Sequence, residues 1–368
     1  MRTALSKVVR PELLLAGMKD ENGDENGIYT RQYLTCCGTR LADGARAAAA
    51  DALLTGNAQA AAAAMTGWER LTRSHGSACG ALHCDDTVAG LLPTAPISAE
   101  AAGAWCEALA QTMTRMENDE AADAVEKLVT NALPAAVRGG RIREWLYENT
   151  VGAEEPAFHT GDSRTAERLA RGAAAVWENA VTMSPDSLQV NLLLPGSYTA
   201  RVAGGRVRLT IADNGTIAVD SRAAGEWTLR IRVPAWAAKA TVLLHGKKAE
   251  VRPGSRIAMK RQWKTGDTVT CGFESAVRTE TGYHQAVTVW NGPVLMTLPV
   301  TRKQVMALCG APVRTEKGVT VKAAAMGGAS AGRLPVSPEL KGSPAETQLV
   351  PFAEAKSCQT VLPVGKNA

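Results

Sequence analysis

Apolar positions in the first half of the chain recur at intervals of three and four residues. The clearest series is Ala122, Val125, Leu128, Val129 and Leu133, which would form one face of a helix. Residues 43–68 carry long alanine runs broken by Gly56, which favours two helices and a short turn. We therefore expect helices over residues 43–68, 99–116, 120–136 and 164–179, with Pro134 near the end of the third stretch.

After Pro185 the spacing of apolar residues changes to every second position. Val207, Leu209 and Ile211 alternate with polar residues, and residues 269–273 repeat the pattern. In residues 227–233 the apolar positions alternate with Thr228, Arg230 and Arg232, which are expected on the opposite face. Glycine-containing turns separate these runs, which is typical of hairpins in an antiparallel β-sandwich.

The two patterns divide the chain into four parts. They are an N-terminal segment (1–37), a helical domain (38–185), a β-sandwich (186–322), and a linker with C-terminal strands that return to the β region (323–368). Residues 323–343 are rich in Ala, Gly, Ser and Pro, which favours a loop. The predicted fold class is α+β multidomain.

Composition narrows the functional classes. The 368 residues are 45% apolar, and the net charge of +5 comes without a dense basic run, which argues against a nucleic-acid partner. No apolar stretch reaches the ~18 residues of a membrane span, and no secretory signal is recognisable, so we expect no membrane partner and a cytoplasmic location. The eight cysteines are too sparse for a disulfide scaffold and are expected to be thiols.

Several segments, taken in order, resemble glycoside hydrolase family 127 and its relatives, best known for β-L-arabinofuranosidases. The resemblance extends from about Trp68 to the C-terminus. In the helical half it is carried by HGSACG (75–80), CDDTVAG (84–90), ADAVEKLVTNALPA (122–135) and LQVNLLLPGS (188–197). In the β half it is carried by WTLRIRVPAW (227–236), QWKTGDTV (262–269), WNGPVLM (290–296) and LVPF (349–352).

This resemblance implies an (α/α) toroid-type helical domain followed by a β-sandwich. Family chains are longer on the N-terminal side, whereas only some seventy residues precede the first matching segment here. The helical domain is therefore expected to be a partial toroid. It would either be completed by a partner chain or a second copy, or exist as a shortened barrel.

The resemblance also implies a catalytic apparatus, and part of it is missing. Family enzymes use a zinc-bound cysteine thiolate as nucleophile and a glutamate as acid/base. The cysteine pair should fall near His159, Thr160 and Gly161, where the sequence has no cysteine. Asp86 matches the position of the acid, and Glu100 matches a metal-binding glutamate, so these two are the candidate catalytic residues.

The zinc ligands are retained unevenly. A family cysteine two residues after the glutamate is Ala102 here, and a shifted alignment that retains Cys106 replaces the glutamate by Ala104. We therefore assign no cofactor and no metal ligand, while zinc itself remains open. The cluster His75, Cys79, His83 and Cys84 matches no standard zinc spacing, and buried thiols and loop histidines are the simpler interpretation.

Candidate substrate-binding residues are His75, His83, His159 and Trp177. Each has an ordinary structural interpretation as well, since lone histidines are often surface or core residues and tryptophans often serve packing. Of the tryptophans in the helical half, Trp68, Trp105, Trp145 and Trp177, one or two would line a sugar pocket. Cys36 and Cys37 lie upstream of the acid segment and are interpreted as two small thiols near a helix start.

Three functional hypotheses follow. The first is a glycoside hydrolase-like protein that acts on or binds carbohydrate without the family's cysteine nucleophile. The second is a non-catalytic carbohydrate-binding or scaffolding descendant, a pseudoenzyme that pairs with another chain. The third is an interaction module without sugar chemistry, because a shared fold alone does not establish function.

Overall fold

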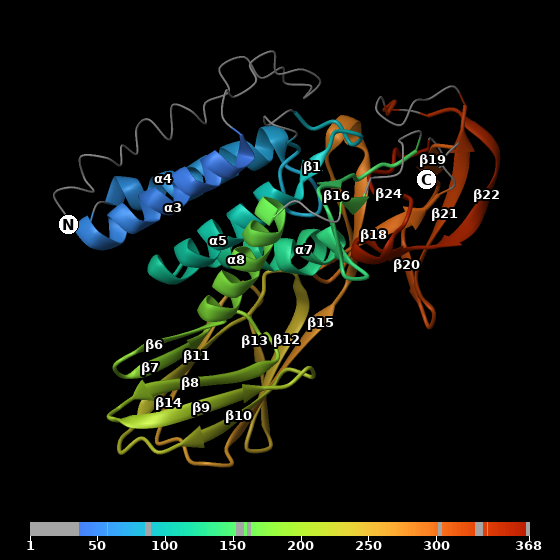
Figure 1. Cartoon of the computed structure of the whole chain (residues 1–368). Coiled ribbons are helices and arrows are strands. Elements are labelled where there is room, and N and C mark those ends of the chain that lie inside the picture. Colours follow the sequence, from blue (N-terminus) through green and yellow to red (C-terminus); the bar gives the residue numbers. More distant parts are fainter. Residues whose placement is uncertain are drawn as a thin grey trace.

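The structure is a computed structural model that describes residues 37–56, 58–84, 90–151, 158–159, 163–300, 304–327, 334–336 and 338–365. Its α-helices all lie before residue 181, with short strands among them, and most of its strands follow. Figure 1 shows the helices above a pair of sheets built from β6 to β15, with the C-terminal strands beside the helices. No helix in the described ranges is both long and apolar enough to cross a membrane.

The predicted helices are present; those predicted over 43–68 and 164–179 extend further at both ends, whereas α5 ends one residue earlier than predicted. They are α3 (Gly38–Thr55), α4 (Ala58–His75), α5 (Ala99–Arg115), α6 (Asp119–Lys127), α7 (Leu133–Ala136) and α8 (Ser163–Ala180). Gly56 ends α3 in the left-handed conformation (φ 73°), which glycine adopts without steric cost. The stretch predicted as one helix over 120–136 is instead interrupted by a π-helical turn, Leu128–Ala132. Pro134 lies in the first turn of α7, where proline is tolerated.

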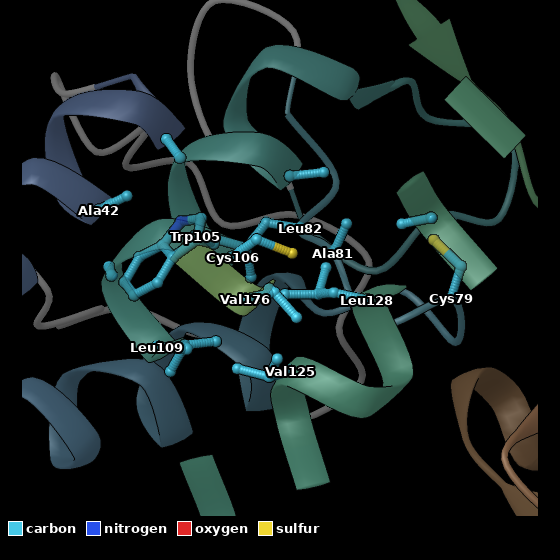
Figure 2. Close-up of a cluster of buried hydrophobic side chains, with 14 of the residues drawn as sticks. Ala42, Cys79, Ala81, Leu82, Trp105, Cys106, Leu109, Val125, Leu128 and Val176 are labelled. Carbon is cyan, nitrogen blue, oxygen red and sulfur yellow. The ribbon is translucent and has the colours of Figure 1, made fainter. Parts of the chain in front are cut away.

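Helix α5 is the centre of the helical domain. It contacts α3, α6 and α8, and Trp105 on its inner face is fully buried with its ring centroid 4.6 Å from that of Trp68. Figure 2 shows Trp105, Cys106 and Leu109 of α5 among side chains of the surrounding elements. A Cβ atom on Gly103 would lie 2.6 Å from the backbone of Arg168 in α8, so the close α5–α8 crossing requires glycine there.

Short strands hold the ends of these helices. β1 (Ile97–Ser98) pairs with β4 (Trp145–Leu146). β2 (Val137–Arg138), β3 (Arg141–Arg143) and β5 (Phe158–His159) form a second small sheet. The β1–β4 pairing brings Trp145 and Leu146 back beside the start of α5, which matters for the site described below.

The strands after α8 form two sheets that share one hydrophobic core. The four-stranded sheet has the order β14-β11-β7-β6 and the six-stranded sheet the order β13-β12-β15-β10-β9-β8. The predicted alternation is confirmed in β9, where Val207, Leu209 and Ile211 are buried. The bounds are β6 (Val181–Ser184), β7 (Ser187–Val190), β8 (Gly196–Val202), β9 (Gly205–Ile211), β10 (Thr216–Ser221), β11 (Trp227–Arg232), β12 (Ala237–Leu244), β13 (Lys247–Val251), β14 (Arg256–Arg261) and β15 (Thr268–Ser275).

Two details of this region differ from the sequence prediction. Strands β7 and β11 are parallel, because the chain passes through β8, β9 and β10 of the other sheet before it returns. Arg232, expected on the exposed face of its strand, is buried, with its side chain 3% exposed. It donates hydrogen bonds to Asp123 and Glu126 of α6, so the burial of Arg232 joins the sheet to the helical domain.

The strands after Ser275 build further sheets with a separate core. One contains β16 (Val277–Thr281), β17 (Val287–Asn291), β18 (Val294–Pro299), β23 (Val350–Pro351) and β24 (Cys358–Gln359), and the other contains β19 (Met306–Leu308), β20 (Val313–Thr315), β21 (Gly318–Met326) and β22 (Leu340–Gln348). The loop predicted over 323–343 is wrong at both of its ends, since residues 323–326 belong to β21 and residues 340–343 to β22. Alanine and glycine are poor strand formers, and pairing with β19 overrides that local preference in β21.

Candidate functional site

A cavity of about 510 Å³ lies where three helices begin. Its lining includes Cys37, Gly38, Thr39, Arg40 and Asp43 at the start of α3, Ser98, Glu100 and Ala101 at the start of α5, and Arg164, Thr165, Glu167, Arg168 and Arg171 of α8. Cys84 and the pair Glu144–Trp145 complete the lining. The walls are thus mainly charged and polar, with one indole.

Each wall is fixed by local structure. The Ser98 side chain caps α5 by accepting a hydrogen bond from the backbone N–H of Ala101 (3.2 Å), which places Glu100 in the first helical turn. The backbone N–H of Ala99 donates to the carbonyl oxygen of Glu144 (2.9 Å). Ser98 is paired with Trp145 in the β1–β4 register. These contacts hold Glu144 and Trp145 directly beside the start of α5.

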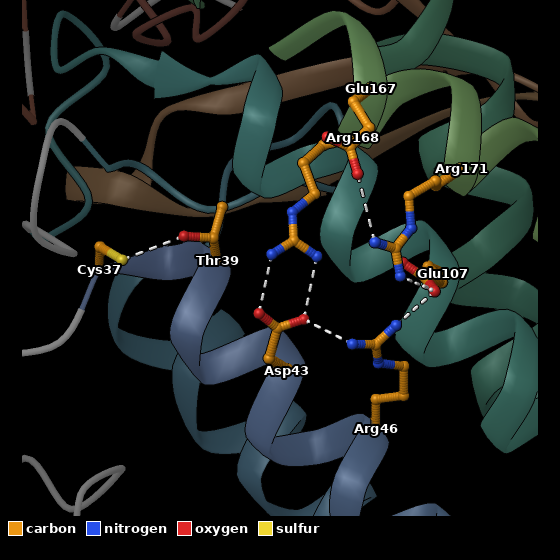
Figure 3. Close-up of polar contacts among 8 residues, drawn as sticks. All are labelled: Cys37, Thr39, Asp43, Arg46, Glu107, Glu167, Arg168 and Arg171. Carbon is orange, nitrogen blue, oxygen red and sulfur yellow. Dashed lines mark hydrogen bonds and ion pairs between the residues drawn. The ribbon is translucent and has the colours of Figure 1, made fainter. Parts of the chain in front are cut away.

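A network of ion pairs joins α3, α5 and α8 at the cavity (Figure 3). Arg168 of α8 makes a two-pronged contact with Asp43 of α3, at 3.0 and 2.9 Å. Arg46 of α3 and Arg171 of α8 both donate to Glu107 of α5, whose side chain is 10% exposed. Hydrogen bonds to Asp43 and to Glu107 raise the pKa values of Arg168 and Arg171, respectively. These charges are therefore committed to holding the three helices together.

Two carboxylates of the cavity lie outside this network. Glu100 and Glu144 are both half-buried, and neither makes an ion pair or side-chain hydrogen bond with any residue in the described ranges. A carboxylate in the first turn of α5 interacts favourably with the partial positive charge of the helix N-terminus. The cavity thus presents two carboxyl groups that its own structure leaves available to a ligand.

The structure brings only some of the predicted site residues together. Glu100 lines the cavity, whereas Asp86 lies outside the described residues, as do Thr160, Gly161 and Cys36. The backbone of His159 belongs to β5, and the structure does not describe its side chain. Glu144 was missed because nothing in its local sequence distinguishes it from other surface glutamates.

His75 and His83 are buried beside one another rather than in this cavity. His75 accepts a hydrogen bond at Nδ1 from the backbone N–H of Gly90 (2.8 Å). His83 Nε2 lies 3.2 Å from a carboxylate oxygen of Glu148, whose side chain is 3% exposed. Glu148 also accepts from the backbone N–H of Ala78. Burial and the Glu148 charge raise the pKa of the nearby Cys79 thiol to about 12. This arrangement is a packed polar cluster.

The tryptophans of the helical half have separate positions. Trp177, 45% exposed, lies near the C-terminal end of α8 and stacks on Tyr198 with ring centroids 5.2 Å apart, away from the cavity at the other end of that helix. Trp68 and Trp105 are core residues. Trp145 alone of the four lines the cavity.

The zinc site expected in the family does not fit the described residues. They contain no group of three or more His, Cys, Asp or Glu side chains arranged to hold a metal ion. Cys106, one of the alternative ligands, is fully buried in the helical core, and burial raises the pKa of its thiol. The side chains around Cys106 in this core are apolar, so they supply no further ligand for a zinc ion.

The fold and site therefore define a helical domain with a polar cavity, joined to β domains. Residues 187–275 match the family described as Beta-L-arabinofuranosidase, GH127 middle domain. This match and the structural neighbours confirm the resemblance of the chain to the GH127 superfamily. No curated protein matches the chain at the level of sequence.

Solved structures share the fold at low sequence identity. One is Ara127N-Se, a GH127 β-L-arabinofuranosidase from Geobacillus stearothermophilus T6, with a TM-score of 0.68 and 17% identity over 90% of this chain and 60% of that one. A protein described as a glycoside hydrolase gives 0.69 and 16% over 95% and 70%. A further GH127 β-arabinofuranosidase gives 0.68 and 16% over 95% and 64%. The chain thus spans about 60 to 70% of the length of these structures.

Proposed function

We propose that this glycoside hydrolase-like chain holds a carbohydrate in the cavity between α3, α5 and α8, and that Glu100 acts on the glycosidic bond. The observation that carries the proposal is the lining of the cavity. Trp145 offers an indole face on which a sugar ring can stack, and Glu100 offers a carboxylate without an ion-pair partner among the described residues. Of the arginines that line the cavity, Arg168 pairs with Asp43 and Arg171 with Glu107.

The proposal includes the finer features expected from the sequence. The helical domain is a partial (α/α) toroid, the two sheets of β6 to β15 are a β-sandwich, and the reaction does not use the family's cysteine nucleophile. The absence of cysteine at residues 159–161 supports the last point. Glycosidases without a thiolate use paired carboxylic acids, so a functional site here needs Glu100 and a second acid.

The test is hydrolysis of aryl glycosides, beginning with 4-nitrophenyl β-L-arabinofuranoside, by the wild type and by Glu100→Gln. Loss of a general acid or base costs about 100- to 10,000-fold in rate. We expect a loss in that range for Glu100→Gln. The matched control is Glu178→Gln, an exposed glutamate of α8 that does not line the cavity. Equal activity of Glu100→Gln and the control would refute the assignment.

The second candidate is a non-catalytic protein that binds carbohydrate in the same cavity. The ion-pair network favours it, because Arg46, Arg168 and Arg171 hold the cavity walls in a fixed arrangement, as a binding site requires. Calorimetric binding of arabinose-containing oligosaccharides without turnover would distinguish it from the hydrolase. A protein that neither binds nor cleaves sugars would leave only an interaction role.

We also propose that a second copy or a partner chain completes the helical layer. This proposal carries over the partial toroid expected from the sequence resemblance. Light scattering of the purified chain tests self-association, and a monomer that binds sugar would refute it. A cytoplasmic location stays a prediction from the sequence, and fractionation of cells that express the tagged chain would test it.

A further inference from the structure

Such a reaction needs a second carboxylate besides Glu100. Asp86 was the candidate from sequence resemblance, but Glu144 lines the same cavity as Glu100. Both side chains are half-buried, and neither has a polar partner among the described residues. Neither carboxyl group is therefore held in a contact that a ligand in the cavity would have to break.

The backbone fixes how far apart the two residues lie. Glu144 is hydrogen-bonded through its carbonyl oxygen to the N–H of Ala99, and Glu100 follows Ala99 in the chain. Hydrogen-bonded residues of antiparallel strands have Cα atoms about 5.5 Å apart, and consecutive Cα atoms are about 3.8 Å apart. The Cα atoms of Glu100 and Glu144 are therefore separated by no more than about 9 Å. Glutamate side chains at that separation can span the about 5 to 9.5 Å between the paired carboxyl groups of glycosidases.

From this juxtaposition we propose that Glu144 is the general acid of the site and Glu100 its base. This inference rests on the proposed function and deepens it. Glu100 lies in the first turn of α5, whereas Glu144 lies between the short strands β3 and β4, next to Trp145, so the two carboxyl groups enter the cavity from different elements.

The reaction balances with water as the only co-reactant. The Glu144 carboxyl gives its proton to the glycosidic oxygen while the bond from that oxygen to the anomeric carbon breaks, and the electron pair leaves with the oxygen. Glu100 takes a proton from water as the water oxygen bonds to the anomeric carbon. Glu100 is then protonated and Glu144 ionised, and proton exchange with solvent restores both. Trp145, adjacent to Glu144, supplies a stacking face for the sugar.

The test uses the whole chain and separates an acid from a structural residue. Glu144→Gln should lose about 100-fold or more on glycosides with a poor leaving group, such as methyl or oligosaccharide glycosides. The same variant should lose far less on 2,4-dinitrophenyl glycosides, because that leaving group needs little protonation. Glu100→Gln should lose activity on both substrate types. Circular dichroism melting confirms folding, which is expected because the Glu144 side chain has no polar contact to lose among the described residues.

Asp86→Asn and the control Glu178→Gln complete the experiment. If Asp86→Asn loses more activity on poor leaving groups than on good ones, and Glu144→Gln does not, Glu144 is not the general acid. The proposed function still stands in that case. Equal losses of Glu144→Gln on both substrate types also overturn an acid role. If the wild type cleaves no glycoside, both the proposed function as a hydrolase and this inference fail.

Discussion

Replacement of Arg232 by leucine tests how the helical and β domains are held together. The Arg232 guanidinium lies between β11 and α6, where it contacts Asp123 and Glu126 and donates to the backbone carbonyl of Asn191 (3.1 Å). Burial lowers the pKa of Arg232, but the two carboxylates outweigh that effect and raise it, so the residue is charged throughout the accessible pH range.

The expected cost follows from what the substitution leaves behind. Removal of one partner of a buried ion pair costs about 3–5 kcal/mol, because the remaining charges lose their compensation. The Asp123 side chain is 35% exposed and the Glu126 side chain 20%, so water partly replaces the arginine. Glu126 also retains its hydrogen bond from Trp236 Nε1 (3.0 Å). We therefore expect the lower end of the range, about 3 kcal/mol, which is roughly a hundredfold change in the unfolding equilibrium.

Urea unfolding monitored by tryptophan fluorescence measures the effect, since Trp236 contacts the same carboxylate. The matched control is Arg230→Leu, which changes an exposed arginine two residues earlier on the same strand. That variant should stay within about 0.5 kcal/mol of the wild type. If Arg232→Leu is as stable as Arg230→Leu, Arg232 does not hold the domains together and the reasoning is refuted.

Two further predictions concern the α5–α8 crossing and the buried thiols. Gly103→Ala should destabilise the fold by about 1–3 kcal/mol, because its Cβ atom would lie 2.6 Å from the backbone of α8. The control Gly225→Ala has open space around it and should stay within about 0.5 kcal/mol of the wild type in the same urea assay. Equal urea midpoints of the two variants would contradict the close packing. Burial raises the pKa values of Cys79 and Cys271 from 9.0 to about 12, so their contribution to stability is complete below pH 9 and is lost as the pH rises from 9 to 12. Urea midpoints measured under reducing conditions should fall over that range, less steeply in Cys79→Ala, and a flat profile would contradict it.

The sequence determined the elements whose causes are local. The intervals of three and four residues predicted the helices, because the residues of a segment alone decide whether one face of its helix is apolar. Gly56 predicted the turn between α3 and α4. Alternation gave β9 and β11 in the same way. The ordered motifs gave the resemblance to glycoside hydrolase family 127, which the match over residues 187–275 bears out.

The tertiary structure decided everything that depends on residues distant in the chain. From the sequence, Arg232 is predicted to be an exposed strand residue. In the structure it is buried against two carboxylates of α6, which belongs to the helical domain. The local sequence of Glu144 is that of an ordinary surface glutamate, and the β1–β4 pairing is what places it beside Glu100. Cys37 lines the same cavity because α3 packs on α5. A periodic pattern records which face of an element is buried. It does not record which partner covers that face, and the partner is what turns separate polar residues into a site.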